Sequence, residues 1–424
     1  MIDTATMDAS AQTDDPIPLD LTDLAVARER IAQSVTRTPM VPSEFLSLAV
    51  GAQVDLKLEN LQRTGSFKLR GASNRIARLL AEGARPPGVI AASAGNHAQG
   101  VAQAARQVGL RAVVVMPSNA SLTKIASCRA LGAEVRLVGD TLEQAADEAM
   151  RLADEQQLVF LHPYDDWDVI AGQGSCGLEM IEDFPDMTVA VVPLGGGGLI
   201  SGIALALKLQ RPDIRLVGVQ ADAVAPWRHF LRDGSLQGIP PAAHTIADGI
   251  KVKRPGLLTR RVIARHVDEI VTVDDNAIAE AIVVLLERTR TIGEGAGVVA
   301  LAALLQGRVS LTADDRVACV ISGGNVDMTL VGRSIDYGLA SSGRLMNVAV
   351  TIVDSPGRLV SLLKSVADLG INVRHVEHRR GELHVPVGMT EVILQMETRD
   401  FEHQRELLDH FADQGLEVRN MMWV

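Results

Sequence analysis

The chain has 424 residues, of which 47% are hydrophobic and 22% charged, so it can bury large cores and global disorder is excluded. Its formal net charge of −11 excludes a broad nucleic-acid interface, which needs a basic face. Three scattered cysteines argue against a disulfide framework or a zinc cluster, and no apolar run approaches the ~20 residues of a membrane helix. The polar, acidic N-terminus lacks the pattern of a signal peptide, so we expect a cytoplasmic protein.

The chain up to residue 330 predicts an α/β region. Residues 1–18 predict a loose tail, helical spacing follows over 21–35, and residues 54–61 alternate like a strand. Beyond residue 66, short aliphatic segments alternate with helical patterns such as 95–109 and 275–290. These segments are apolar throughout, which is typical of parallel strands covered on both faces. The predicted strands are 88–93, 111–117, 133–139, 188–194, 214–221 and 316–322.

The pattern changes near residue 335 and predicts a second domain. Glycine and serine in 336–344 indicate a linker. Residues 345–424 then predict strand, helix, strand, strand, helix and strand, which is the order of a ferredoxin-like α+β domain.

Residues 93–100, SAGNHAQG, lie between a predicted strand and a predicted helix. Ligands of open α/β sheets bind beyond the carboxyl ends of strands. The backbone N–H groups, together with Ser93, Asn96 and His97, would meet at a helix N-terminus and form a seat for a carboxylate. A helix cap with a tight turn accounts for the same residues, so this loop alone leaves both interpretations open.

Residues 193–202, PLGGGGLISG, place four glycines between a strand and a helix. Without side chains, successive amides can close around a phosphate, and the helix dipole adds to the attraction. The loop lacks the Gly-Lys-Ser/Thr of a Walker motif. Ile200 or Ser201 stands where a dinucleotide fingerprint has its third glycine. A close-packed turn is the alternative, but four glycines favour a phosphate site.

Ser322 and Lys68 complete this pattern. Ser322 opens SGGNVD at another strand end, where it could bind a ligand or simply form a turn. Lys68, in TGSFKLRGA at the expected start of a helix, is by itself either a solvated lysine or a reactive amine. A lysine that forms a Schiff base, joined to a phosphate loop and a carboxylate seat, predicts the cofactor pyridoxal 5'-phosphate.

The segments SFKLRGA, SAGNHAQG, GGGGLISG and SGGN occur in this order in the threonine/serine dehydratases of the fold-type II (tryptophan-synthase β-like) pyridoxal phosphate enzymes, which residues 20–335 resemble. The resemblance implies a two-lobed catalytic region over 19–335, with a smaller lobe of about 63–165 inserted in the larger one. Residues 345–424 resemble an ACT domain through DSPGRLVSLLKSVADLGINV. The whole chain is similar to threonine ammonia-lyases that carry one ACT domain.

The resemblance also implies roles around the cofactor ring. Lys68 would form the Schiff base and act as general base, and Phe67 would pack near the ring. Asn96 would hydrogen-bond the 3′ oxygen of the ring, and Ser322 would face the pyridine nitrogen. Glu294 would lie near the cofactor. It is followed by glycine, where many relatives have proline, so the subgroup is in question but the chemistry is not.

Two further sets of residues follow from the same resemblance. The cofactor phosphate would be held by the amides of Gly195, Gly196, Gly197 and Gly198. The substrate carboxylate would be lined by Ser93, Ala94, Gly95 and His97. The implied reaction is β-elimination and deamination of L-threonine, and also of L-serine, to 2-oxobutanoate or pyruvate and ammonia.

In the ACT-like region, Gly357 and Asn372 match positions that often line amino-acid sites between paired ACT domains. The resemblance therefore implies an amino-acid effector, with isoleucine and valine as first candidates, and a homo-oligomer. A dimerising module that binds no ligand is the alternative.

Other functions fit the same motifs. Serine racemase or serine dehydratase activity would use the same pocket, and a nucleotide-activated catabolic enzyme would carry the same loops. A catalytically silent amino-acid sensor belongs to a different class, and the intact Lys68 and glycine loop argue against it. We expect no metal site, since only residues 219–226 hint at a cation and their spacing is weak.

Overall fold

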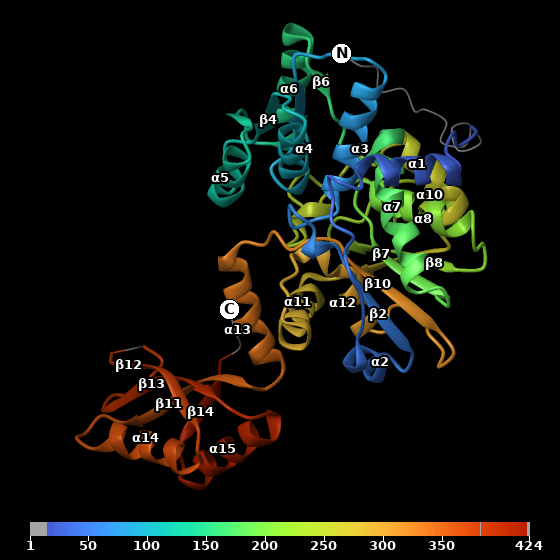
Figure 1. Ribbon diagram of the computed structural model, residues 1–424. Helices are drawn as coiled ribbons and strands as arrows, with labels where there is room; N and C mark the ends of the chain where they lie inside the picture. The colour runs from blue at the N-terminus through green and yellow to red at the C-terminus, as the bar shows by residue number, and fades with distance from the viewer. Residues whose placement is uncertain (1–14, 382, 422–424) are drawn as a thin grey trace. The chain divides into compact units, whose positions relative to one another are not determined.

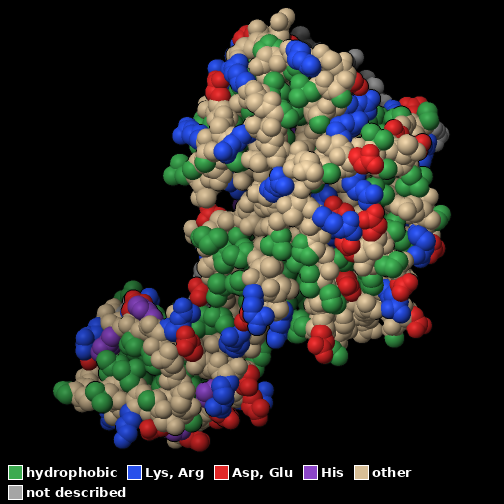
Figure 2. All heavy atoms as spheres, viewed as in Figure 1, with side chains coloured by type: hydrophobic (Ala, Val, Ile, Leu, Met, Phe, Trp, Pro, Cys, Tyr) green, Lys and Arg blue, Asp and Glu red, His purple; other side chains and the backbone are tan. Residues whose placement is uncertain are grey.

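The computed structural model describes residues 15–381 and 383–421, which fall into two compact units. Unit 1 ends at Asp327, and unit 2 begins at Met328 (Figure 1). Within these ranges no helix is long and apolar enough to cross a bilayer. Lysine, arginine and acidic side chains are interspersed on the visible face of unit 1, without a face of one sign (Figure 2).

A six-stranded sheet forms the larger lobe of unit 1. Its strands, in spatial order, are β1 (Met40–Pro42), β2 (Gln53–Leu58), β10 (Arg316–Ile321), β7 (Val189–Pro193), β8 (Arg215–Ala221) and β9 (Glu269–Val273). All neighbours are parallel except β1 and β2. The sequence predicted the central strands but not β1 or β9, because these edge strands are short or only half-buried.

The apolar runs of the central strands reflect burial on both faces. In β7, Val189 and Val191 face a core shared with α11 and α12, whereas Ala190 and Val192 face a core shared with α7 and α8. The α-helices of unit 1 are α1 (Leu21–Ile31), α2 (Glu44–Val50), α3 (Lys68–Ala81), α4 (Asn96–Gln107), α5 (Leu122–Ala130), α6 (Leu142–Gln156), α7 (Trp167–Asp183), α8 (Gly198–Lys208), α9 (Phe230–Asp233), α10 (Leu257–His266), α11 (Asp275–Thr289) and α12 (Val299–Leu305).

A second, four-stranded parallel sheet forms the smaller lobe. Its strands, in spatial order, are β5 (Glu134–Leu137), β4 (Ala112–Met116), β3 (Val89–Ala92) and β6 (Val159–Phe160). All four lie between β2 and β7 in the chain, so this sheet interrupts the larger lobe, and the predicted range of 63–165 contains it. The sequence analysis missed β6, because two residues are too few to display a period.

The predicted tail of 1–18 lies partly outside the described residues, which begin at Asp15. The described part is attached to unit 1. The carboxylate of Asp15 pairs with Arg261 of α10 at 2.6 Å, and its carbonyl accepts a hydrogen bond from Arg265. Ile17 packs against the core shared with α7 and α8. Residues 15–18 therefore differ from the loose segment that their polarity predicted.

Unit 2 has the predicted ferredoxin-like order. It comprises α13 (Met328–Ser341), β11 (Leu345–Val353), α14 (Arg358–Asp368), β12 (Asn372–Arg379), β13 (Met389–Glu397), α15 (Phe401–Asp413) and β14 (Glu417–Asn420). The sheet is antiparallel, in the order β12-β13-β11-β14. Its core joins Val348 and Val350 of β11 to Val366 of α14 and Phe411 of α15, so both helices cover one face of the sheet.

The predicted linker of 336–344 is largely helical, because α13 continues to Ser341. Gly338 contributed to the predicted linker through its low helix propensity. It is buried in the structure, together with Val331 and Ser334. Burial of this helix face outweighs the propensity of single residues, so only the last few residues before β11 connect helix and strand.

Candidate active site

A cavity of about 220 Å³ is lined by both lobes of unit 1. It lies at the carboxyl ends of β3, β6, β7 and β10, where each strand passes into a loop. All the residues that the sequence predicted around the cofactor and the substrate line this cavity. They are Phe67, Lys68, Ser93, Ala94, Gly95, Asn96, His97, Gly195, Gly196, Gly197, Gly198, Glu294 and Ser322.

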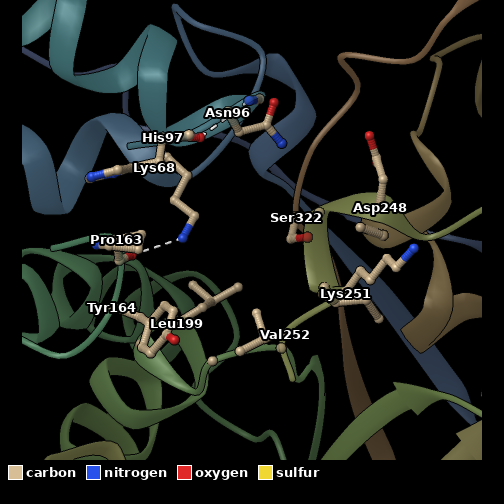
Figure 3. Close-up of a pocket in the computed structure, with 18 of the residues that line it drawn as sticks. Lys68, Asn96, His97, Pro163, Tyr164, Leu199, Asp248, Lys251, Val252 and Ser322 are labelled. Atoms are coloured by element: carbon tan, nitrogen blue, oxygen red, sulfur yellow. Dashed lines mark hydrogen bonds between the residues drawn. The ribbon is translucent and has the colours of Figure 1, made fainter. Parts of the chain in front are cut away.

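The backbone next to β10 positions Lys68. Phe67 N–H donates to the carbonyl of Ser322 at 3.2 Å, and Gly324 N–H donates to the carbonyl of Gly65 at 2.8 Å. Gly65 has a φ of +71°, and a Cβ there would lie 2.3 Å from Oδ1 of Asn325. These contacts hold the first residue of α3, Lys68, beside the end of β10 (Figure 3).

The Lys68 amine is held without a carboxylate partner in the described part of the chain. Its Nζ donates to the carbonyl of Pro163 at 2.8 Å and lies 5.1 Å from the centre of the Phe67 ring. Burial disfavours the ammonium and lowers the pKa of Lys68 to about 8, although the nearby Glu294 opposes the shift. An amine with this pKa is unprotonated far more often near neutral pH than an ordinary lysine, as a nucleophile requires.

A group of buried ion pairs fixes α3 two residues further on, and we call it the α3 ion cluster. Arg70 donates to both oxygens of Glu59 at 2.8 Å and to the two oxygens of Glu179 at 2.7 and 2.8 Å. Lys57 donates to Glu179 at 2.7 Å. All four side chains are buried, so the cluster ties α3 to β2 and α7 and holds Lys68 in place.

The glycine loop requires glycine for steric reasons. A Cβ on Gly196 would lie 2.4 Å from the ring of Tyr164, and a Cβ on Gly197 would lie 2.8 Å from Thr259. Gly197 also has a φ of +96°, which other residues rarely adopt. The loop therefore passes between Tyr164 and α10 at a distance that no side chain would permit.

The amides of this loop are free while its carbonyls are held. Trp227 Nε1–H donates to the carbonyl of Gly195 at 2.8 Å, and the Thr259 hydroxyl donates to that of Gly196 at 2.9 Å. In the described ranges, no group accepts a hydrogen bond from the N–H groups of Gly195–Gly198. Unpaired buried amides at the start of α8 are costly unless a ligand accepts from them, and they suit an anion.

The loop at the start of α4 is similar. Gly95 N–H donates to the Ser93 hydroxyl at 3.2 Å, but the N–H groups of Ala94, Asn96 and His97 have no acceptor among the described residues. No side chain in the described part of the protein caps this helix. Of the two interpretations that the sequence left open, the structure therefore favours an anion seat over a self-capped turn.

His97 and Glu294 are neutral groups at this seat. His97 is buried with Nε2 2.9 Å from the carbonyl of Leu161, so Nε2 carries the hydrogen. Burial, with a smaller effect of Lys68, lowers its pKa to about 3. Burial and the charge of Asp248 raise the pKa of Glu294 to about 8, although Lys124 and a hydrogen bond from Asn96 oppose the shift. Neither side chain brings a charge to the cavity at neutral pH.

The structure adds residues that the sequence analysis missed. Pro163 and Tyr164 enter the cavity from the loop after β6, and Asp248 and Lys251 enter from the segment at 248–251 (Figure 3). Lys124 of α5 also lines the cavity. The rule that ligands bind beyond strand ends would have found HPYDD after β6, had that short strand been recognised. No sequence signal marks Asp248 or Lys251, because they follow no strand.

Unit 2 does not bring its two predicted effector residues into one cavity. Gly357 lines a separate cavity of about 350 Å³ with His378, Arg380 and Thr390 among others. Asn372 is absent from its lining, and its side chain donates to Glu397 at 3.0 Å.

Comparison with known proteins agrees with this geometry. Residues 31–323 match the family model described as pyridoxal-phosphate dependent enzyme. The chain belongs to this family. The free glycine amides and the half-buried Lys68 fit a cofactor that carries a phosphate and an aldehyde, and this pyridoxal-phosphate enzyme offers a seat for both in one cavity.

Three relatives place the enzyme within the family. It is 45% identical to the L-threonine ammonia-lyase of Thermotoga maritima over 401 residues, which cover 95% of this chain and 99% of the relative. The structure of processed threonine deaminase isoform 2 from Solanum lycopersicum is 33% identical, with a TM-score of 0.69 over 76% of this chain and 90% of that one. Maize serine racemase is 33% identical, with a TM-score of 0.71 over 77% of this chain and 99% of that one.

Proposed function

We propose that this pyridoxal-phosphate enzyme is an L-threonine ammonia-lyase, which also accepts L-serine. It would release 2-oxobutanoate or pyruvate, together with ammonia. One observation carries the proposal. A lysine of lowered pKa, four free glycine amides and an uncapped helix N-terminus face the same cavity. The similarity to the Thermotoga L-threonine ammonia-lyase over nearly the whole chain supports the choice of substrate.

The charge and position of each residue in the cavity suggest its role in the proposed reaction. Lys68 would bind the aldehyde carbon of the cofactor and later take the proton from the substrate α-carbon at Nζ. The amides of Gly195–Gly198 would hold the phosphate, and the loop of residues 93–97 would hold the substrate carboxylate. When bound, pyridoxal phosphate supplies an electron sink for the charge that develops on the α-carbon.

The remaining polar residues would orient the ring. Asn96 begins α4, Ser322 directly follows β10, and both line the same cavity, so they can bind opposite parts of one flat ligand. Neutral Glu294 keeps a proton that it can donate, and it accepts a hydrogen bond from Asn96. A neutral serine beside the pyridine nitrogen would favour loss of the β-hydroxyl over transamination.

The first test is release of 2-oxo acid by the purified holoenzyme given L-threonine and, separately, L-serine. Formation of 2-oxobutanoate from L-threonine is the expected result. The similarity to serine racemase makes D-serine formation the second candidate, so chiral analysis of remaining serine runs beside the assay. Racemisation without 2-oxo acid release, or a holoenzyme inert to both substrates, would refute the proposal. An inert holoenzyme would favour the alternative that the protein is a catalytically silent amino-acid sensor.

For unit 2 we propose an ACT domain that binds isoleucine or valine and pairs with a second copy. The ferredoxin-like order and the cavity beside Gly357 support this, as does the match to the Thermotoga relative, whose 401 aligned residues exceed the length of unit 1. Three reduced, buried cysteines agree with a cytoplasmic enzyme. The test titrates isoleucine and valine into the threonine assay with the full-length enzyme and with Arg380→Ala. Loss of the response in the variant is expected. An equal response in both proteins would rule out this cavity.

A further inference from the structure

An ion pair links the two lobes at the cavity. Nζ of Lys124 lies 2.6 Å from Oδ2 of Asp248, and both residues line the cavity. Lys124 belongs to the first turn of α5, in the smaller lobe. Asp248 opens the 3-10 turn η2 (Asp248–Ile250), in the larger lobe. The catalytic roles proposed above do not use this pair.

Each partner is anchored to its own lobe. Ile125 and Cys128 of α5 are buried in the core of the smaller lobe. Ile250 of η2 is buried in the core of the larger lobe, with Ala296. The pair is therefore a contact between two separately packed lobes rather than an internal brace of one element.

The Lys124 ammonium also lies beside the anion seat. A Cβ on Gly95 would lie 3.8 Å from Nζ of Lys124. Gly95 is the residue from which α4 begins, and the neighbouring amides of Ala94, Asn96 and His97 are free within the described ranges. A carboxylate that accepts from these amides would lie next to the ammonium as well.

The charges of the surrounding groups make Lys124 distinctive. Burial opposes its charge, but the contact with Asp248 outweighs burial and raises the pKa of Lys124, so it remains a cation. His97 and Glu294 are neutral at the same place. The side chain of Lys124 is 16% exposed, whereas that of Asp248 is 57% exposed. The Lys124 ammonium is therefore held at the cavity by the carboxylate of Asp248, which is itself exposed to water.

We propose that Lys124 is a specificity residue that reads the α-carboxylate of the substrate. Its ammonium pairs with a carboxylate bound on residues 93–97, while Asp248 holds the ammonium from the other lobe. The substrates selected are amino acids with a free carboxylate, in preference to their amides or esters. The proposal rests on the ammonia-lyase activity proposed above.

The decisive experiment compares L-threonine and L-threonine amide as substrates of the holoenzyme and of Lys124→Met. Loss of a charge-assisted contact is expected to raise the KM for L-threonine about 10- to 100-fold, with kcat changed by less than about threefold. The preference for L-threonine over its amide should fall by a similar factor. Lys124→Arg keeps the charge and is expected to recover most of the affinity and of the preference.

The chain offers a matched control. Lys208 and Asp268 form a similar pair at 2.7 Å, with side chains 11% and 42% exposed, and neither lines the cavity. Lys208→Met should leave both kinetic constants and the preference unchanged. Visible absorbance of the lysine-bound cofactor, measured for every variant, confirms that each protein is folded and loaded.

A further variant distinguishes two possible roles of Lys124, which are binding the substrate carboxylate and linking the two lobes through Asp248. Asp248→Asn keeps the ammonium but removes the group that holds it from the other lobe, so the KM for L-threonine should rise less than it does in Lys124→Met. An equal rise of KM in Lys124→Met and Asp248→Asn would mean that the pair only clasps the lobes, and would overturn the proposal. A KM in Lys124→Met that matches Lys208→Met would also overturn it while leaving the ammonia-lyase activity in place. A wild-type holoenzyme that releases no 2-oxo acid would refute that activity itself.

Discussion

Unit 1 contains two groups of buried ionisable side chains that differ in how they are paired. In the α3 ion cluster, every charge has partners, and Arg70 alone donates to two carboxylates. Burial opposes the charge of Glu59, but Arg70 holds the pKa of Glu59 below its ordinary value. In the cavity, Lys68, His97 and Glu294 lack opposite charges at contact distance in the described chain, and burial shifts each pKa toward the neutral form.

This difference distinguishes side chains that stabilise the structure from side chains that can bind or react with a ligand. Charges that neutralise one another stabilise a fixed geometry but have nothing left to offer a ligand. Groups that are buried without a partner change protonation easily and keep their hydrogen-bonding capacity for a ligand. The two groups are only two residues apart on α3, at Lys68 and Arg70, so one helix carries both.

The largest expected effect comes from Lys68→Ala. Because the amine is the proposed nucleophile and general base, kcat/KM for L-threonine should fall by at least about 10³-fold. Circular dichroism should match the wild type, since no ion pair is lost. The visible absorbance of the lysine-bound cofactor should disappear. Near-normal turnover in this variant would remove Lys68 from the chemistry.

Arg70→Met should cause the next largest effect, this time on stability. The change leaves Glu59 and Glu179 buried with only Lys57 to compensate them, which costs about 3–5 kcal/mol in the free energy of unfolding. The measurement is urea unfolding followed by tryptophan fluorescence. An unfolding midpoint equal to that of the wild type would show that the α3 ion cluster does not stabilise unit 1.

Glu294→Gln should change how stability depends on pH. The pKa is about 8 in the folded protein against an ordinary value of 4.5, so between these values the folded state holds a proton that the unfolded state has lost. The wild type therefore loses stability as pH rises through this window, by at most about 1.4 kcal/mol per pH unit. The glutamine variant should lack this loss. Urea midpoints of both cofactor-free proteins test it, and parallel pH profiles would contradict it.

The smallest effect is expected for Arg151→Met, as a surface counterpart to Arg70→Met. Arg151 pairs with Glu148 and Glu155 along α6, and the side chains of Arg151 and Glu155 are each more than half exposed. Such pairs gain little over hydration, so the urea midpoint should not move measurably. A shift as large as that of Arg70→Met would mean that burial does not distinguish the two clusters.

Much of the fold was predictable because its signals are local. The continuous apolar runs of β3, β4, β7, β8 and β10 indicated the parallel strands, and all line up with predicted segments. The edge strands β1 and β9, the two-residue β6 and the helix α13 were missed. In each case strand pairing or burial of a helix face overrides a weak or contrary local pattern.

The candidate site was predicted to a similar extent. Gly195–Gly198 were found because a run of glycines at a strand-to-helix turn is typical of an anion site, and Lys68 was found because that site needs a reactive amine to hold an aldehyde. Tyr164, Asp248 and Lys124 were not found, although they line the same cavity. Their residue types are common at surfaces, and only the approach of the two lobes places them beside the seat of residues 93–97.

The amino-acid sequence specifies the chemical groups and their order along the chain. These follow from residue type and backbone pattern over a few positions, as in the four glycines that leave their amides free. The protonation and the pairing of those groups depend on how the chain packs. The lowered pKa of Lys68, the neutral Glu294 and the pairing of Lys124 with Asp248 all depend on burial and on distances between segments far apart in the chain. Burial and long-range electrostatics are properties of the packed molecule, so no local sequence pattern encodes them.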